Sequence, residues 1–228
     1  MPVNRIRSYA ARRGRNSALT RERMAEHLPA REVPEGPIDA RASFGTTAPL
    51  VLEIGCGHGA AAIAYCQAHP EHHLVAMDVH TPGIARMMAA AAEAGEPHPG
   101  VPNLHVAQGD AVVLLEERLA PGSLHAVHLF FPDPWPKKKH AKRRFVTPYT
   151  LRLIHSRLQD GHALLVATDQ EFYAEHVLEQ LAAHGGFTVT TGERPAWRPT
   201  AGYEAKGRAA GRAIHEIRAV RTAGTGLD

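Results

Sequence analysis

The chain has 228 residues, of which 44% are hydrophobic and 21% charged, and its formal net charge is +3. This size and apolar content allow one sizeable core, so we expect one domain with short extensions. No run of about 18 apolar residues occurs, which argues against a membrane span, and the arginine-rich N-terminus lacks the apolar stretch of a signal peptide. Two cysteines, Cys56 and Cys66, form neither a disulfide framework nor a CxxC pair, so a reducing cytoplasm is the simplest setting.

Positive charge is gathered in two segments. Residues 1–31 hold eight Arg and two Glu, a balance of +6, and residues 137–144 hold six Lys/Arg, another +6. Subtracting both from the net charge of +3 leaves −9 for the rest of the chain. Basic segments on an acidic body are the electrostatic footprint of a protein that binds a polyanion. For residues 1–31 alone, a solvated basic tail is an equal alternative.

The elements predicted in chain order alternate between strands and helices. Residues 1–45 hold scattered arginines, prolines and glycines, with one short helix near Ser17–Glu26, and we interpret them as a mobile basic arm. Residues 46–228 form the domain. In it we predict strands at 50–54, 73–78, 104–107, 125–131, 162–168, 187–191 and 212–220, and helices at 58–68, 82–94, 111–119, 145–158 and 170–184. This alternation predicts an α/β fold with a mainly parallel sheet covered on both faces.

Residues 53–59, EIGCGHG, follow the first predicted strand and open a helix. Glycines there let the backbone turn tightly and approach a ligand closely. Gly55, Gly57 and Ala60 also satisfy the G-x-G-x-x-G/A pattern of dinucleotide enzymes, so the spacing alone leaves both classes open. The G-x-G-x-G loop with Glu53 before it resembles the class I S-adenosylmethionine-dependent methyltransferases. A carboxylate there suits the ammonium and sulfonium groups of that cofactor, whereas it would repel a pyrophosphate.

Further acids follow the next strands. Asp78 ends the second predicted strand, where we expect it to bind ribose hydroxyls, although NAD enzymes use the same device. Asp110 follows the third, placed to contact an adenine amino group, with the N-cap of the next helix as the alternative. Together with Glu53 and Asp133, they give four acids at the carboxyl ends of strands, which is where open α/β sheets bind ligands.

The most informative stretch is residues 127–144, VHLFFPDPWPKKKHAKRR. Its apolar start predicts the end of a buried strand. Pro132 and Pro134 then fix the backbone around Asp133, because a proline sets its own φ and restrains the residue before it. A tryptophan and six cations follow. This combination is typical of a site for a planar nucleic-acid base attached to a polyanion.

Four segments closely resemble the bacterial tRNA (guanine-N(7)-)-methyltransferases: FPDPWPKKKHAKRR (131–144), LEIGCGHG (52–59), AMDVHTPG (76–83) and ATDQEFYAEH (167–176). The end segments RSYAARRGR (7–15) and RPTAGYEAKGRAAGRAI (198–214) resemble the same family, so the likeness spans nearly the whole chain. It implies the class I methyltransferase (Rossmann-like) fold, with a mostly parallel seven-stranded sheet, one antiparallel strand near an edge and helices on both faces. It also implies methyl transfer from S-adenosyl-L-methionine to N7 of a guanosine in the tRNA variable loop, expected at position 46. The enzyme would be a cytoplasmic monomer or homodimer.

The resemblance also implies roles for single residues. The implied cofactor set is Glu53, Gly55, Gly57, Asp78, Asp110 and Asp133. Asp133 is in addition the implied catalytic residue, and the implied substrate set is Lys137, Asp169, Tyr203 and Glu204. One position departs from the family pattern: Ala201 stands where a threonine is expected, with Thr200 one place early. Ala201 lacks the hydroxyl with which that threonine would form a hydrogen bond.

Other interpretations are weighed against this one. A small-molecule methyltransferase is disfavoured by the basic run, a nicotinamide-dependent oxidoreductase by Glu53, and an RNA-binding protein without activity by the intact acids. His69, His72 and His73 cluster in the sequence but lack an acid or Cys ligand set at zinc spacing, so we expect loop histidines and no metal site. Cys56 has no evident base to activate it, which favours a small residue packed under the cofactor.

Overall fold

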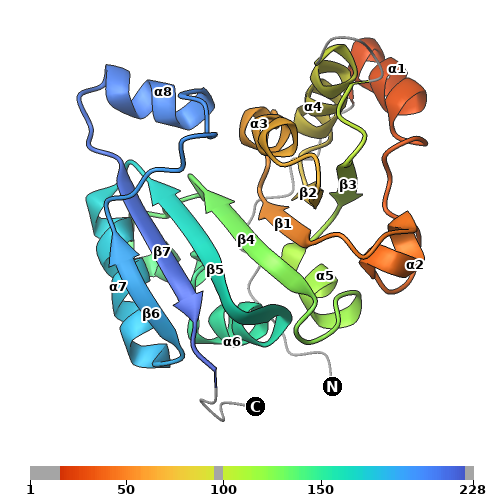
Figure 1. Ribbon diagram of the computed structural model, residues 1–228. Helices are drawn as coiled ribbons and strands as arrows, with labels where there is room; N and C mark the ends of the chain where they lie inside the picture. Colours follow the sequence, from red (N-terminus) through yellow and green to blue (C-terminus); the bar gives the residue numbers. More distant parts are fainter. Residues whose placement is uncertain (1–15, 95–99, 224–228) are drawn as a thin grey trace.

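The computed structural model describes residues 16–94 and 100–223, which form a seven-stranded sheet with helices on both faces (Figure 1). The strands lie in the order β3-β2-β1-β4-β5-β7-β6. Strands β1 to β5 pair in parallel, whereas β7 runs antiparallel to both β5 and β6. This confirms the predicted sheet. The strand bounds are β1 (Leu50–Ile54), β2 (His73–Asp78), β3 (Leu104–Gln108), β4 (Leu124–Phe130), β5 (Leu158–Thr168), β6 (Phe187–Thr191) and β7 (His215–Arg221).

Helices cover the sheet in two layers (Figure 1). One face carries α3 (Ala60–Ala68) and α4 (Thr81–Glu93), with α1 (Ala18–His27) packed against α4. The other carries α5 (Ala111–Glu117), α6 (Pro148–Arg157) and α7 (Glu171–His184). Among the described residues, the short helix α2 (Ala40–Phe44), the 3-10 helix η1 (Lys138–Arg143) and α8 (Gly202–Ala209) complete the set.

Strand β1 buries an acid, Glu53, among apolar residues. All five of its residues are buried, as expected for a central parallel strand covered on both faces. Leu50 and Leu52 pack into the core under α5–α7, whereas Val51 packs into the core under α3 and α4. Because side chains alternate along a strand, Glu53 points to the same side as Val51. A carboxylate is thereby placed inside an apolar core.

All the predicted strands and helices occur, with ends shifted by a few residues. Helix α6 begins at Pro148 rather than at Phe145, because the Thr147 hydroxyl accepts from Thr150 N–H (3.2 Å) and so caps the helix. Pro148 then fills the first helical position, where its missing N–H is not needed. Strand β5 begins four residues earlier than predicted, at Leu158. Helices α2, η1 and α8 are absent from the sequence prediction.

Residues 16–45, assigned to the arm by the sequence, pack onto the body of the molecule. The Arg31 side chain is 9% exposed, and its Nη1 donates to the carbonyl oxygen of Val101 (2.6 Å). Val33 and Ile38 belong to the core. Packing among the described residues therefore begins before the predicted boundary at residue 46, while the segment 7–15 lies outside the described residues. Within the part of the chain that the structure describes, no helix is long and apolar enough to cross a bilayer.

Candidate active site

Five acids lie along one edge of the sheet. Glu53 lies in β1 and Asp78 ends β2, while Asp110, Asp133 and Asp169 follow β3, β4 and β5. These five strands are parallel neighbours, so their carboxyl ends share one edge, and α8 lies over the ends of β4 and β5 (Figure 1). The structure thus brings together acids that are spread over 117 positions of the sequence, from 53 to 169.

The glycine loop between β1 and α3 turns through left-handed backbone. Gly55, Gly57 and Gly59 have φ of +75°, +57° and +76°, a region that only glycine adopts readily. A Cβ at Gly55 or Gly57 would meet no atom within 4 Å, so that side of the loop is open. A Cβ at Gly59 would instead lie 2.0 Å from Cγ of Met87. The first two glycines therefore leave room for a ligand, and the third lets α4 approach.

Asp78 ties the glycine loop to the end of β2. Its Oδ2 accepts from Gly57 N–H (2.9 Å) and its Oδ1 from His80 N–H (2.9 Å). The N–H of Gly55 donates to the carbonyl oxygen of Met77 (2.8 Å), which fixes the start of the same loop. The carboxylate predicted to bind ribose is therefore held rigidly beside the open glycines.

Glu53 is 3% exposed, and its carboxylate lies beside the buried ring of His128. Its Oε2 has no hydrogen-bond partner among the described residues, and Nδ1 of His128 lies 3.6 Å away. His128 itself is 1% exposed and packs against the rings of Tyr65 and Trp197 at centroid distances of 4.9 and 5.2 Å. A buried carboxylate oxygen without a hydrogen bond is costly, so it makes Glu53 a candidate ligand-binding residue. The sequence analysis did not single out His128. This residue lies on β4, directly opposite Glu53 of β1 in the strand register.

Cys56 lies in the glycine loop and is 8% exposed. Burial raises the pKa of its thiol well above the ordinary value, and the negative charges of Asp78 and Glu53 raise it further. Since the thiolate is the reactive form, this thiol is a packed side chain and not a nucleophile. The burial agrees with the packed small residue expected from the sequence, whereas its place beneath a cofactor stays a prediction.

Asp110 caps helix α5. Its Oδ1 accepts from Val112 N–H (2.9 Å), and its backbone has the extended geometry of an N-cap. The helix-capping role, given in the sequence analysis as the alternative for Asp110, therefore occurs. Capping is compatible with the proposed contact with adenine, because a carboxylate has two oxygens and about four acceptor sites.

The turn that carries Asp133 is strained at both ends. Phe131 N–H donates to the carbonyl oxygen of Ala167 (2.7 Å), which anchors the exit from β4. Phe131 and Trp135 have φ of +52° and +44°, whereas the prolines after them would favour extended backbone at negative φ. A bulky residue at such φ costs about 1–3 kcal/mol, and such strain collects at functional sites. Asp133 lies between the two, exposed to solvent.

The basic run folds into η1 immediately after this turn. Lys137 is the residue before the helix, and the guanidinium of Arg143 lies 5.0 Å from the centroid of the Trp135 ring. The His140 ring meets the same tryptophan edge-on at 5.7 Å. The lysines remain exposed, so this short helix and the residue before it display a cluster of cations next to Asp133: Lys137, Lys138, Lys139 and Lys142.

Helix α8 approaches Asp169 through a glycine. A Cβ at Gly207 would lie 2.8 Å from Cβ of Asp169, so a larger residue would push the helix away. The Asp169 carboxylate accepts from Nε of Arg212 (2.8 Å). Tyr203 is 66% exposed on the same helix, with Nζ of Lys206 5.4 Å from its ring centroid. Two of the predicted substrate residues, Asp169 and Tyr203, are therefore carried by adjoining segments.

The fourth predicted substrate residue, Glu204, is buried. It is 1% exposed and accepts from Nε of Arg194 (2.9 Å), Arg198 (3.2 Å) and Arg208 (3.0 Å). Arg198 is 3% exposed and also binds both carboxylate oxygens of Glu216 on β7. Burial raises the pKa of Glu204, but the hydrogen bonds from Arg194 and Arg208 and the charge of Arg198 outweigh it, so the pKa lies below the ordinary value. This geometry favours a positioning role, holding α8 on β7, over the direct substrate contact predicted from the sequence.

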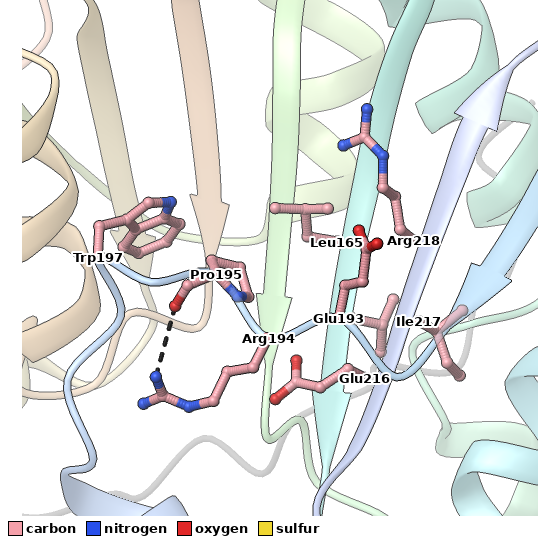
Figure 2. A pocket seen from close by; sticks show the side chains of 9 residues that line it. Leu165, Glu193, Arg194, Pro195, Trp197, Glu216, Ile217 and Arg218 are labelled. Carbon is pink, nitrogen blue, oxygen red and sulfur yellow. Dashed lines mark hydrogen bonds between the residues drawn. The ribbon is translucent and has the colours of Figure 1, made fainter.

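A cavity of about 270 Å³ lies next to this network, over β5 and β7 (Figure 2). Figure 2 shows the charged side chains of Glu193, Arg194, Glu216 and Arg218 around it, with Trp197 at one side. Small-molecule pockets are typically about 300–1,000 Å³ and mostly apolar. This one is smaller and charged, and none of the acids at the strand ends line it. We therefore place the candidate site at the strand ends and not in this cavity.

Ala201, where the family pattern has threonine, is the N-cap residue of α8. It has φ −141° and ψ 170°, and no side chain caps the helix. We expect Ala201→Thr to raise the free energy of unfolding by about 1 kcal/mol, because a hydroxyl there accepts from an unpaired N–H of the first turn. Urea unfolding measures the change. Ala201→Val has the same shape without the hydroxyl, so an equal gain in both variants would contradict capping.

Comparisons with known proteins give a consistent result. Residues 47–217 match a protein-family model described as "Putative methyltransferase". The tRNA (guanine-N(7)-)-methyltransferase of Shewanella pealeana is 40% identical over 222 residues, covering 94% of this chain and 92% of that protein. The enzyme of the same name from Nitrosomonas europaea is 39% identical, covering 96% and 97%. The crystal structure of the 16S rRNA methyltransferase KamB superposes with a TM-score of 0.57 at 15% identity, covering 84% of this chain and 99% of that one, which shows the shared fold.

Proposed function

The chain belongs to the tRNA (guanine-N(7)-)-methyltransferase family, and from this premise we propose that it transfers a methyl group from S-adenosyl-L-methionine to N7 of a guanosine in tRNA. The observation that carries the proposal is one sheet edge that holds the open glycine loop, the acids and the basic helix η1. The proposal includes the variable loop at position 46 as the target, residues 46–228 as the catalytic domain, the cytoplasm as the setting and a monomer or homodimer as the active form.

The residues at the strand ends fit this cofactor. Glu53 has a buried oxygen that accepts no hydrogen bond from the described residues, which suits the ammonium group of the methionine part. Gly55 and Gly57 leave space where a Cβ would stand, and the carboxylates of Asp78 and Asp110 suit ribose hydroxyls and the adenine amino group. When bound, the cofactor supplies a methyl group on a positively charged sulfur.

The reaction demands alignment more than proton transfer. N7 of guanine has a lone pair and no proton to lose, so no strong general base is needed. Holding two reactants in the right geometry can supply up to about 7–11 kcal/mol of the barrier. Asp133 is suited to this task, because its strained turn fixes an exposed carboxylate at the end of β4. We assign it to accept from the N–H groups of the guanine edge and to offset the positive charge that grows on the ring.

The surrounding residues would bind the rest of the tRNA. The target base must leave its stack to reach the sheet edge, and cations that bind flanking phosphates hold it there. Lys137, at the start of η1, and Asp169 and Tyr203, under and on α8, are the proposed substrate contacts. Trp135 provides an aromatic ring on which a base can stack. Glu204 acts through the helix that carries Tyr203.

The cations of η1 give a prediction about salt dependence. We expect the combined variant with Lys137, Lys138, Lys142 and Arg143 replaced by glutamine to bind tRNA with a flatter plot of log affinity against log salt. The slope falls by about 0.7–0.9 for each phosphate that the protein no longer neutralises. The control is Arg152→Gln, which removes an exposed cation on α6. We expect it to leave the slope unchanged. Equal slopes for the wild type, the combined variant and Arg152→Gln would show that the cations of η1 neutralise no tRNA phosphates.

Nucleoside analysis of tRNA tests the function directly. After incubation of the protein with unmodified tRNA and methyl-labelled S-adenosylmethionine, we expect the label in 7-methylguanosine. Label in a small acceptor but not in tRNA would indicate a small-molecule methyltransferase. Absence of transfer together with stabilisation by NAD and not by S-adenosylhomocysteine would indicate the oxidoreductase alternative. Binding of tRNA without transfer would indicate an inactive RNA-binding protein.

A further inference from the structure

A second cluster of polar side chains lies at the opposite edge of the sheet, in the loop between α3 and β2. Ligand atoms of His69, Glu71 and His72 all lie within 4.8 Å of one another. His72 immediately precedes β2 and Asp78 ends it, so the six-residue strand separates this cluster from Asp78 by about 20 Å. None of these three residues is among those proposed for methyl transfer.

The carboxylate lies between the two imidazole rings. Oε1 of Glu71 is 3.4 Å from Nδ1 of His69 and 3.5 Å from Nε2 of His72. Ligands bound to one zinc ion at about 2.1 Å in tetrahedral geometry lie about 3.4 Å apart. Two of the three ligand separations thus already have the spacing of a metal site. Two imidazole nitrogens and one carboxylate oxygen form a donor set that suits zinc and neighbouring divalent transition metals.

The loop is held in place by groups beneath it. The buried Asn103 donates from Nδ2 to the carbonyl oxygens of Cys66 (3.1 Å), His69 (3.0 Å) and His72 (2.8 Å). Tyr65 Oη lies 2.6 Å from Nδ1 of His72, so this nitrogen is occupied and Nε2 is directed to the ligand side. Metal-binding histidines in proteins characteristically use their second nitrogen in this way, which fixes the tautomer and the ring orientation.

Further histidines surround the cluster. The ring of His125 lies 4.7 Å from that of His72, and the ring of His162 lies 4.1 Å from that of His125. His73, grouped with His69 and His72 in the sequence, contributes to a different cluster, because its Nδ1 lies 2.7 Å from Nε2 of His105.

We propose that His69, Glu71 and His72 bind one divalent transition-metal ion, zinc by preference, with water in the remaining position. The proposal departs from the expectation drawn from the sequence, which grouped His73 with the other two histidines and found no acid among the ligands. In the structure, Glu71 and not His73 lies together with His69 and His72. The ion would join the end of α3 to the start of β2, so it would stabilise the fold without taking part in methyl transfer.

Zinc titration of the untagged, metal-stripped protein tests the proposal. By calorimetry we expect one Zn²⁺ ion per chain and a higher Tm with zinc, because the ion binds only the folded loop. His72→Ala and Glu71→Gln each weaken zinc binding by at least about tenfold, in the range seen when groups that support a metal ion are removed. Glu71 has a 61% exposed side chain, so its replacement leaves the fold intact and isolates the ligand effect.

The control is His27→Ala, which removes a histidine that lies 3.8 Å from a single acid, Glu26. It leaves zinc affinity unchanged. Cobalt substituted for zinc gives visible absorption bands typical of four-coordinate geometry, and these are absent in Glu71→Gln. Equal, weak zinc binding by the wild type and all variants would overturn the proposal. Methylation activity is no part of this test, so its outcome is independent of the proposed function.

Discussion

We expect Asp133→Ala to lower kcat for tRNA methylation by at least about a hundredfold, the loss typical when a reactant is misplaced or a charge-stabilising group is removed. The Kd for S-adenosylhomocysteine should change by less than about tenfold, or about 1.4 kcal/mol. The reason is position: Asp133 is exposed at the end of β4, whereas the glycine loop and Asp78 hold the cofactor side from β1 and β2. Steady-state assays with labelled cofactor measure kcat, and calorimetry measures the Kd.

Two variants make this result specific. Asp133→Asn keeps the shape and removes the charge, so its kcat separates charge stabilisation from placement of the base. Glu117→Ala removes an exposed acid at the end of α5 and should leave kcat and Kd unchanged. Near-normal turnover by Asp133→Ala would end the assignment of this residue, even if the protein methylates tRNA.

The second large effect concerns Arg198. We expect Arg198→Met to lower the free energy of unfolding by about 3–5 kcal/mol, because Glu204 and Glu216 would be left buried without their shared cation. Urea unfolding followed by circular dichroism measures the loss. Arg208→Met is the matched control: it also removes a partner of Glu204, but the Arg208 side chain is 48% exposed, so we expect a loss below about 1 kcal/mol.

Rescue and pH give two further readouts of the same network. Adding Glu216→Gln to Arg198→Met should restore part of the lost stability, since one buried charge is removed. The depressed pKa of Glu204 stabilises the wild type above the ordinary carboxyl pKa, and this contribution is lost as pH falls through the lower pKa of the folded state. The stability gap between wild type and Arg198→Met should therefore narrow below about pH 4. Equal losses in Arg198→Met and Arg208→Met would contradict the network.

Much of the sheet could be predicted because its signals are local. Residues 50–54 and 73–78 are short apolar runs that end in glycine or acid, and both strands occur with those bounds. The position of Asp133 follows in the same way, since an apolar strand, a proline and an acid stand in order along the chain. Once the strands are parallel neighbours, their terminal acids must meet at one edge, so the candidate site needs no long-range information.

The features that sequence reasoning missed depend on distant partners. Helix α8 contains Gly202 and Gly207, which oppose helix formation, and it is held by Glu204 through arginines and a strand that lies further along the chain. The positive φ of Phe131 contradicts the rule for residues before proline, because tertiary contacts such as the bond to Ala167 override local preference. His128 looks like any strand residue until its register with Glu53 is known.

The place of β7 in the sheet has a consequence for synthesis of the chain. Strand β6 pairs with no other described strand than β7, and Arg198 finds Glu216 only there. During translation, the residues of β1 to β5 emerge before those of β7. The surface around Tyr203 cannot form until residues 215–221 have left the ribosome and paired with β5 and β6 as strand β7. A nascent polypeptide therefore completes the packing that holds α8 only after β7 has been synthesised.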